Sequence, residues 1–329
     1  MISRVTGAAF LLAAAVVLRT AGAAEPAGPL VLYTSQPDKI AAETVDAFTK
    51  RYPKVKVETF RSGTTEVMNK LQAELAGGAP RPDVLFIADA VTMEQLKTDK
   101  RLTALPDVDV AALPPEAYDP DRTYFGSKLI TTGIMVNAAA AKRPSSWKDL
   151  LAPDAKGQVI VPSPLYSGAA LIHMAALSDE HVFGPGYFVD LARNGATAAR
   201  GNGAVLSAVA GGQRLYGVAV DFMALNAKQK GSPVDFVFPE EGVTAVTEPV
   251  AVLRTAKNPD AAHAFIDFVL SKDGQELAAR QGFLPARKDV APPAGFPPAD
   301  KLKILSIDAG KVAAREEELK KTFADLFGG

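Results

Sequence analysis

The chain has 329 residues, with 36 lysines and arginines against 37 aspartates and glutamates, three histidines and no cysteine. This length corresponds to about two domains of ~150 residues each, and the near-neutral charge argues against nucleic acid as the main partner, because phosphate contacts need clustered basic residues. The absence of cysteine excludes disulfide scaffolds, zinc–thiolate sites, iron–sulfur clusters and thiol nucleophiles.

The first 24 residues have the pattern of a secretory signal peptide. Arg4 precedes an uninterrupted apolar run over 8–18, Arg19 ends that run, and small residues follow at 21–24. The run is short for a membrane span, and no cysteine follows it to carry a lipid anchor. We expect a signal peptide over 1–24, cleaved after Ala23 or Ala24, and a periplasmic product; an uncleaved anchor is the alternative.

The first half of the remaining chain alternates strands and helices. Apolar or alternating runs predict strands over 30–33, 55–60 and 83–87, and amphipathic periodicity predicts helices over 38–51 and 66–75. This β–α–β–α–β order is typical of a parallel sheet covered by helices. The fold class that we expect is therefore α/β.

The second half continues in the same style, without a repeat of fixed period or a low-complexity linker. Apolar runs predict further strands, and helical periodicity bounded by glycine or polar residues predicts further helices. The expected strands are 129–137, 159–161, 217–220, 234–239 and 250–253, and the expected helices are 167–177, 203–209, 259–270 and 309–327. The last of these helices is charged and amphipathic.

The chain contains no strong enzyme motif. It has no G-x-S-x-G sequence, no P-loop and no H-E-x-x-H sequence. The stretch 201–203 resembles part of a nucleotide loop, but it lacks the third glycine and a preceding strand. His173 and His263 lie in apolar helical runs, where a hydrogen-bonded, half-buried histidine is the simpler interpretation. We expect no catalytic residue, no metal and no cofactor.

Three loops rich in serine, threonine and glycine each follow a predicted strand and open a predicted helix. They lie at 33–35, 62–65 and 163–169. The N-terminus of a helix offers unpaired backbone N–H groups and the positive end of the helix dipole, so such loops hold oxyanions even without arginine. Ordinary N-capping by serine and threonine is the alternative interpretation.

A carboxylate directly follows the predicted strand 217–220. Asp221 would lie at the carboxyl end of this strand, which is where open α/β sheets bind ligands. Its functional interpretation is a partner for a cationic group on the ligand. Its structural interpretation is a helix cap.

Several segments taken together resemble the type II periplasmic solute-binding proteins of ABC importers, in the family that includes ferric-iron and 2-aminoethylphosphonate binders. The resemblance covers nearly the whole mature chain, and the combination of segments carries it. The segments are LYTS at 32–35, FTKRYP at 48–53, RSGT at 61–64, PDVL at 82–85, WKDL at 147–150, GAVLSAV at 203–209 and GFLPARKDV at 282–290.

The resemblance implies two α/β lobes with mixed sheets flanked by helices, joined by two crossing strands, with the ligand cleft between them. Lobe one would be 25–129 plus about 249–300, lobe two 130–248, and the helix at about 301–329 would pack on lobe two. The crossings would fall near 128–132 and 247–250. The protein would be a monomer that closes over a small solute and delivers it to a membrane permease.

The family's functional positions imply an anionic ligand. Ferric binders have two adjacent tyrosines where this chain has Asp221 and Phe222. The match is instead to a phosphonate pocket, in which Asp221 would pair with the ammonium group of 2-aminoethylphosphonate; another organophosphate is possible in the same pocket. The expected ligand-binding residues are Ser35, Ser62, Gly63, Thr64, Thr65, Tyr166, Ser167, Gly168, Ala169, Asn202, Gly203 and Asp221. A ferric-iron-binding protein and, in a different class, a secreted hydrolase are the alternatives.

Overall fold

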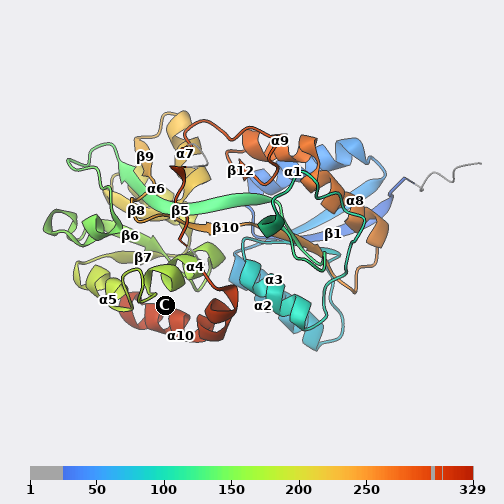
Figure 1. Ribbon diagram of the computed structural model, residues 1–329, viewed down its shortest axis with the longest axis horizontal. Helices are drawn as coiled ribbons and strands as arrows, with labels where there is room; N and C mark the ends of the chain where they lie inside the picture. Colours follow the sequence, from blue (N-terminus) through green and yellow to red (C-terminus); the bar gives the residue numbers. More distant parts are fainter. Residues whose placement is uncertain (1–24, 298–300, 306, 329) are drawn as a thin grey trace, which may run out of the picture.

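The computed structural model describes residues 25–297, 301–305 and 307–328. The expected signal peptide, 1–24, and its cleavage position lie outside these residues. Within the described ranges no helix combines the length and the apolar character that crossing a membrane requires. Figure 1 shows two lobes side by side, each built on a central sheet.

The first lobe contains a five-stranded sheet in the order β2-β1-β3-β11-β4. Strand β1 runs parallel to β2 and β3, and β11 runs antiparallel to β3 and β4. The strands are β1 (Gly28–Thr34), β2 (Val55–Arg61), β3 (Val84–Phe86), β4 (Phe125–Gly126) and β11 (Pro249–Val252), and the helices are α1 (Asp38–Arg51), α2 (Thr64–Ala76), α3 (Ala90–Thr98), α8 (Pro259–Leu270) and α9 (Lys272–Arg280). The expected α/β class is confirmed.

The second lobe contains a seven-stranded sheet arranged around its longest strand, β5. The sheet order is β10-β5-β8-β6-β7, with β9 and β12 also pairing with β5. Strand β5 is antiparallel to all of its partners, and β6 is parallel to β7 and β8. The strands are β5 (Lys128–Asn137), β6 (Val159–Pro162), β7 (Thr197–Ala199), β8 (Tyr216–Val220), β9 (Val234–Val237), β10 (Thr244–Val246) and β12 (Leu284–Pro285), and the helices are α4 (Gly168–Leu177), α5 (Gly186–Arg193), α6 (Asn202–Ala210) and α7 (Asp221–Gln229).

Each lobe has its own apolar core, as the patterned strands and helices predict. In the first lobe, Phe48 of α1 meets Phe265 of α8 edge to face, with 5.0 Å between the ring centroids and both side chains fully buried. In the second lobe, Trp147 is fully buried, and its indole N–H donates to the Gly242 carbonyl at 2.9 Å. Burying such rings supplies apolar area without leaving a polar atom unpaired.

The chain passes from the first lobe to the second after β4 and returns after β10, and a buried ion pair joins these two crossings. Ser127 separates β4 from β5 on the way out, and 247–248 separate β10 from β11 on the way back. The ammonium of Lys128 lies 2.7 Å from the Glu248 carboxylate, and both side chains are 3% exposed. These positions support the division into 25–129, 130–248 and a return segment from about 249, which we retain as a proposal.

The end of the return segment differs from the sequence expectation. Gly295 lies against Leu225 of α7, and the ring of Phe296 packs on Phe238 with 6.0 Å between centroids. Leu225 and Phe238 both belong to the second lobe. The chain has therefore left the first lobe before residue 300, because this stretch covers apolar surface beside β9 rather than beside α8.

The C-terminal helix α10 (Ala309–Phe327) packs against α4 and α5 of the second lobe. It also contacts α3 of the first lobe, which the sequence analysis did not anticipate. Its buried residues Val312, Leu319 and Phe323 share one apolar cluster with Val91 of α3. Figure 1 shows this helix, in red, reaching from the second lobe to the side of α3. The helix therefore touches both lobes.

Candidate ligand-binding cleft

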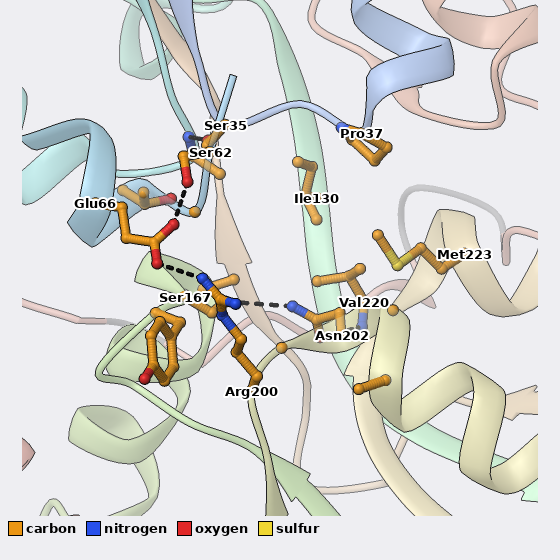
Figure 2. A pocket seen from close by; sticks show the side chains of 18 of the residues that line it. Ser35, Pro37, Ser62, Glu66, Ile130, Ser167, Arg200, Asn202, Val220 and Met223 are labelled. Atoms are coloured by element: carbon orange, nitrogen blue, oxygen red, sulfur yellow. Dashed lines mark hydrogen bonds and ion pairs between the residues drawn. The ribbon is translucent and has the colours of Figure 1, made fainter. Parts of the chain in front are cut away.

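A cavity of about 430 Å³ lies between the two lobes, with the crossing segments on one of its sides. Figure 2 shows that Ser35, Ser62 and Glu66 face Ser167 and Arg200 across it. The lining comprises Ser35, Pro37, Arg61, Ser62, Gly63, Thr64, Glu66 and Ala88 from the first lobe, Ile130 and Glu248 from the crossings, and Tyr166, Ser167, Ala169, Arg200, Gly201, Asn202, Gly203, Ala204, Val220, Phe222 and Met223 from the second lobe.

Helices α2, α4 and α6 begin at this cavity, and the first residues of α7 line it as well. Helix α4 is capped by its own Ser167 hydroxyl, which accepts from the Ala170 N–H at 3.3 Å. Helices α2 and α6 begin after Gly63 and Gly201, and neither glycine provides a side-chain cap. The first N–H groups of these two helices therefore lack a capping side chain at the positive end of the helix dipole, where anions bind.

Asn202 connects two walls of the cavity. Its amide nitrogen donates to the Ser167 hydroxyl at 3.2 Å, and its amide oxygen accepts from the Val220 N–H at 3.2 Å. These bonds hold the start of α6 beside the start of α4 and the end of β8. Asn202 therefore positions the helix starts, and its side chain is already engaged on both sides.

Two arginines line the cavity that the sequence analysis did not select. Arg200 follows β7, and its guanidinium lies 5.0 Å from the centroid of the Tyr166 ring. Arg61 ends β2, and its Nε donates to the Gln36 carbonyl at 2.7 Å. Two features of the sequence could have identified these arginines. Arg61 opens the RSGT segment, and Arg200 directly precedes the glycine-rich start of α6.

Glu66 lies in the first turn of α2 and faces both a hydroxyl and a guanidinium. One of its carboxylate oxygens accepts from the Ser62 hydroxyl, and the other is paired with Arg200 of the opposite lobe. The Ser62 hydrogen bond and the Arg200 charge hold the pKa of this carboxyl below its usual range. Such a carboxylate keeps its negative charge at neutral pH and is a weak base.

Nine of the twelve predicted site residues line the cavity. They are Ser35, Ser62, Gly63, Thr64, Tyr166, Ser167, Ala169, Asn202 and Gly203. Thr65 lies one residue further into α2, and Gly168 is packed against the opposite lobe, so neither is part of the lining. The structure therefore brings together residues from all three predicted loops.

The position of Asp221 corrects the sequence analysis. Its side chain is fully buried and accepts from both the backbone N–H and the hydroxyl of Thr131 on β5, and also from the Phe222 N–H. The neighbouring residues Val220 and Phe222 line the cavity, and Asp221 does not. The carboxylate faces the paired strand β5 because that strand offers two donors at this register. Asp221 fastens α7 to the sheet and is not available to an ammonium group in the cleft.

The two lobes meet at two glycines beside the cavity, Gly63 and Gly168. A Cβ atom on Gly63 would lie 2.9 Å from the Tyr166 carbonyl oxygen of the other lobe, and one on Gly168 would lie 2.6 Å from the Ala88 carbonyl oxygen. Both distances are below van der Waals contact, so no larger residue fits without moving the lobes apart. This arrangement brings backbone from both lobes to the same ligand space.

Comparison with known proteins decides the family. Residues 43–303 match the family described as bacterial extracellular solute-binding protein. The chain belongs to this family. The sequence resemblance to periplasmic solute-binding proteins is thereby confirmed.

Known relatives of this solute-binding protein extend over most of its length. An uncharacterised protein of Haemophilus influenzae is 27% identical and covers 91% of this chain and 90% of its own. The Fe(3+)-binding periplasmic protein of Serratia marcescens is 26% identical over 75% of both chains. The solved structure of the periplasmic binding protein AfuA from Actinobacillus pleuropneumoniae, with fructose 6-phosphate bound, has a TM-score of 0.81 and 24% identity over 91% of this chain and 98% of its own. This last likeness shows the two-lobed fold.

The aromatic residues of this solute-binding protein do not form a paired-phenol site among the residues lining the described cavity. Tyr166 is the one tyrosine in that lining, and Phe222, which has no donor atom, packs on Phe283 with 4.2 Å between ring centroids. The hydroxyl of Tyr33 donates to Glu74 at 2.7 Å, and Tyr33 is not part of the lining. The donors that do face the cavity are helix N–H groups, hydroxyls and guanidinium groups, which suit an oxyanion.

Proposed function

We propose that this protein is the periplasmic component of an ABC importer that captures a small phosphate- or phosphonate-bearing solute and delivers it to a membrane permease. One observation carries the proposal: the starts of α2, α4 and α6 lie at a single cavity, α2 and α6 without a side-chain cap, and Arg200 lines the same cavity. A phosphoryl group offers three oxygens as hydrogen-bond acceptors. Backbone N–H groups at helix N-termini and arginine side chains are the donors that bind phosphoryl groups in other proteins.

The size of the cavity supports a small solute. A volume of about 430 Å³ lies within the range of ordinary small-molecule pockets. AfuA, which shares the fold, has fructose 6-phosphate in its structure, a phosphate monoester that fits this description. Contacts from both lobes would bury the ligand on closure, so the ligand would stabilise the closed form more than the open form.

The proposal includes 2-aminoethylphosphonate, on grounds other than those of the sequence analysis. Asp221 faces away from the cleft, so it does not supply the carboxylate for the ammonium group. Glu66 is the carboxylate that lines the cavity next to Arg200. A ligand with a phosphonate at one end and an ammonium at the other would therefore find both charges matched.

A panel of candidate ligands tests the proposal by thermal unfolding. The probes are 2-aminoethylphosphonate, glycerol 3-phosphate, fructose 6-phosphate, ferric citrate and putrescine, each in excess. A ligand at 100 times its dissociation constant stabilises the folded form by about 2.7 kcal/mol, which raises the melting temperature by several degrees. We expect the rise with one of the three phosphorus compounds. A rise with ferric citrate alone or putrescine alone overturns the proposal.

A variant pair then places the ligand in the cleft. Arg200→Gln removes the guanidinium that we assign to the phosphoryl group, and charged hydrogen bonds of this kind contribute about 1.5–3 kcal/mol each. We expect an affinity loss of about 10- to 150-fold in titration calorimetry. Arg193→Gln is the control, because Arg193 lies on α5 and its side chain is 77% exposed. Equal affinity in both variants would mean that the solute binds elsewhere.

A secreted hydrolase is the class that this proposal excludes. Ser62 does have a carboxylate beside it, which the sequence analysis did not foresee. The lowered pKa of Glu66 makes it a weak base, and its second oxygen is occupied by Arg200. We therefore assign Ser62 to ligand binding. Release of inorganic phosphate from any of the probe esters by the purified protein would contradict this assignment.

A further inference from the structure

An ion pair crosses the cleft at the place where the proposed ligand binds. Glu66 belongs to α2 of the first lobe, and Arg200 follows β7 of the second. Their side chains are in direct contact, and Ser62 donates to the second carboxylate oxygen (Figure 2). The guanidinium that suits a phosphoryl group is thus already engaged by a carboxylate.

The other charged groups of the lining have separate partners. Two arginines and two glutamates line the cavity, so their formal charges cancel. Glu248 is paired with the buried ammonium of Lys128 at 2.7 Å. Arg61 donates to the Gln36 carbonyl and lies 3.7 Å from Asp38. An anionic ligand would therefore disturb the ion pair between Glu66 and Arg200.

A bound phosphoryl group would compete with Glu66 for Arg200. The Glu66 side chain is 35% exposed and stays at the edge of the cavity because α2 and Ser62 hold it there. A carboxylate close to a phosphoryl dianion is repelled by it. A hydroxyl or ammonium group on the same ligand removes this penalty by donating to the carboxylate oxygen that Arg200 has left.

We infer that Glu66 determines specificity: the cleft selects phosphate esters or phosphonates that carry a hydrogen-bond donor within reach of Glu66, and it rejects inorganic phosphate. This inference rests on the proposed function and narrows its ligand class. Glu66 acts here as a ligand-contacting residue, and the same carboxylate pairs with Arg200 of the opposite lobe.

Matched ligand pairs test this inference by titration calorimetry. The pairs are 2-aminoethylphosphonate with ethylphosphonate and glycerol 3-phosphate with propyl phosphate, with inorganic phosphate as the bare anion. We expect the wild-type protein to prefer the donor-bearing member of at least one pair by about 10-fold or more, and to bind inorganic phosphate more weakly still. In Glu66→Gln, which keeps the size of the side chain but not its charge, the preference falls to about threefold or less and inorganic phosphate binds more tightly.

Glu58→Gln is the matched control. Glu58 lies on β2, is 63% exposed and pairs with Arg81 outside the cavity lining. We expect this variant to show the same ligand preferences as the wild-type protein. A preference that survives unchanged in Glu66→Gln, or equal wild-type binding within both pairs, overturns the inference while phosphoryl binding stands. Failure of every phosphorus compound to bind the wild-type protein and Glu66→Gln overturns the proposed function as well.

Discussion

Thr131 and Asp221 are joined by two hydrogen bonds to a single carboxylate oxygen, one from the Thr131 backbone N–H at 2.9 Å and one from its hydroxyl at 2.6 Å. All of these groups are buried. The contact links the long strand β5 to the first residue of α7. It explains why a carboxylate at the end of a strand does not face the ligand space.

The first prediction concerns what Asp221 does. Asp221→Ala leaves the Thr131 and Phe222 donors without their acceptor, and each buried group left unpaired costs about 1–3 kcal/mol. We expect a clear loss in the free energy of urea-induced unfolding. The affinity of the folded variant for 2-aminoethylphosphonate should stay within about twofold of the wild-type value, as measured by calorimetry. A stable variant that has lost this ligand would restore Asp221 to the binding site.

The second prediction concerns pH. Burial raises the pKa of Asp221 to about 7, against the opposing effect of its hydrogen bonds with Thr131 and Phe222. An unfolded aspartate has a pKa near ~3.9, so between these values the folded state binds more protons. The stability from this group is fully present below pH ~4 and is lost as the pH rises towards 7, with a slope of up to about 1.4 kcal/mol per pH unit.

Asp221→Asn isolates this effect, because an amide of the same shape has no charge to lose. Unfolding free energies of both proteins are measured in urea at pH 5, 6 and 7. We expect the stability of the wild-type protein relative to Asp221→Asn to fall across the series. A difference that is constant with pH would show that Asp221 does not titrate in this range.

The third prediction uses the close contact of the lobes at Gly168. A Cβ atom there would lie 2.6 Å from the Ala88 carbonyl oxygen, and this backbone atom has little freedom to move. Overpacking of this kind costs about 1–3 kcal/mol. The cost destabilises the arrangement in which the two lobes touch at Gly168, so we expect Gly168→Ala to bind the ligand about 5- to 150-fold more weakly. Gly186→Ala, on α5, is the control because nothing lies within 4 Å of its Cβ position. Identical ligand affinities for the two variants would show that the contact at Gly168 does not affect ligand binding.

The fourth prediction concerns the ion pair between the crossings. Lys128→Met leaves the Glu248 carboxylate buried without its cation, and breaking a buried pair in this way costs about 3–5 kcal/mol. In Lys128→Met/Glu248→Gln no charge remains, so the double variant should be more stable than Lys128→Met. Urea unfolding of the single and double variants measures the coupling. A double variant less stable than Lys128→Met would mean that the Glu248 charge has another stabilising partner.

Local patterns in the sequence predicted the elements that surround the cleft well. Periodicity and caps placed α1, α8 and α10 at the residues where the structure has them. The three serine- and glycine-rich loops precede α1, α2 and α4, and residues of all three loops line one cavity. These features follow from nearby residues, because helix starts and strand ends are set within a few positions.

The features that the sequence did not reveal depend on contacts with residues that are distant in the chain. The direction of Asp221 is set by Thr131, which lies 90 positions away on a strand whose register no local pattern shows. Arg200 becomes a cleft residue only when the lobes bring it to Glu66, 134 positions away. A side chain at the end of a strand has several potential hydrogen-bonding partners, and the tertiary packing determines which of them it contacts.

The helix α10 has a consequence for how the molecule unfolds. Two lobes with separate cores would ordinarily melt as separate units. Because Leu319 and Phe323 of α10 share a cluster with Val91 of the first lobe, loss of either lobe uncovers apolar surface on the other. The last helix therefore couples the stabilities of the two halves, and heating should produce one cooperative transition instead of two.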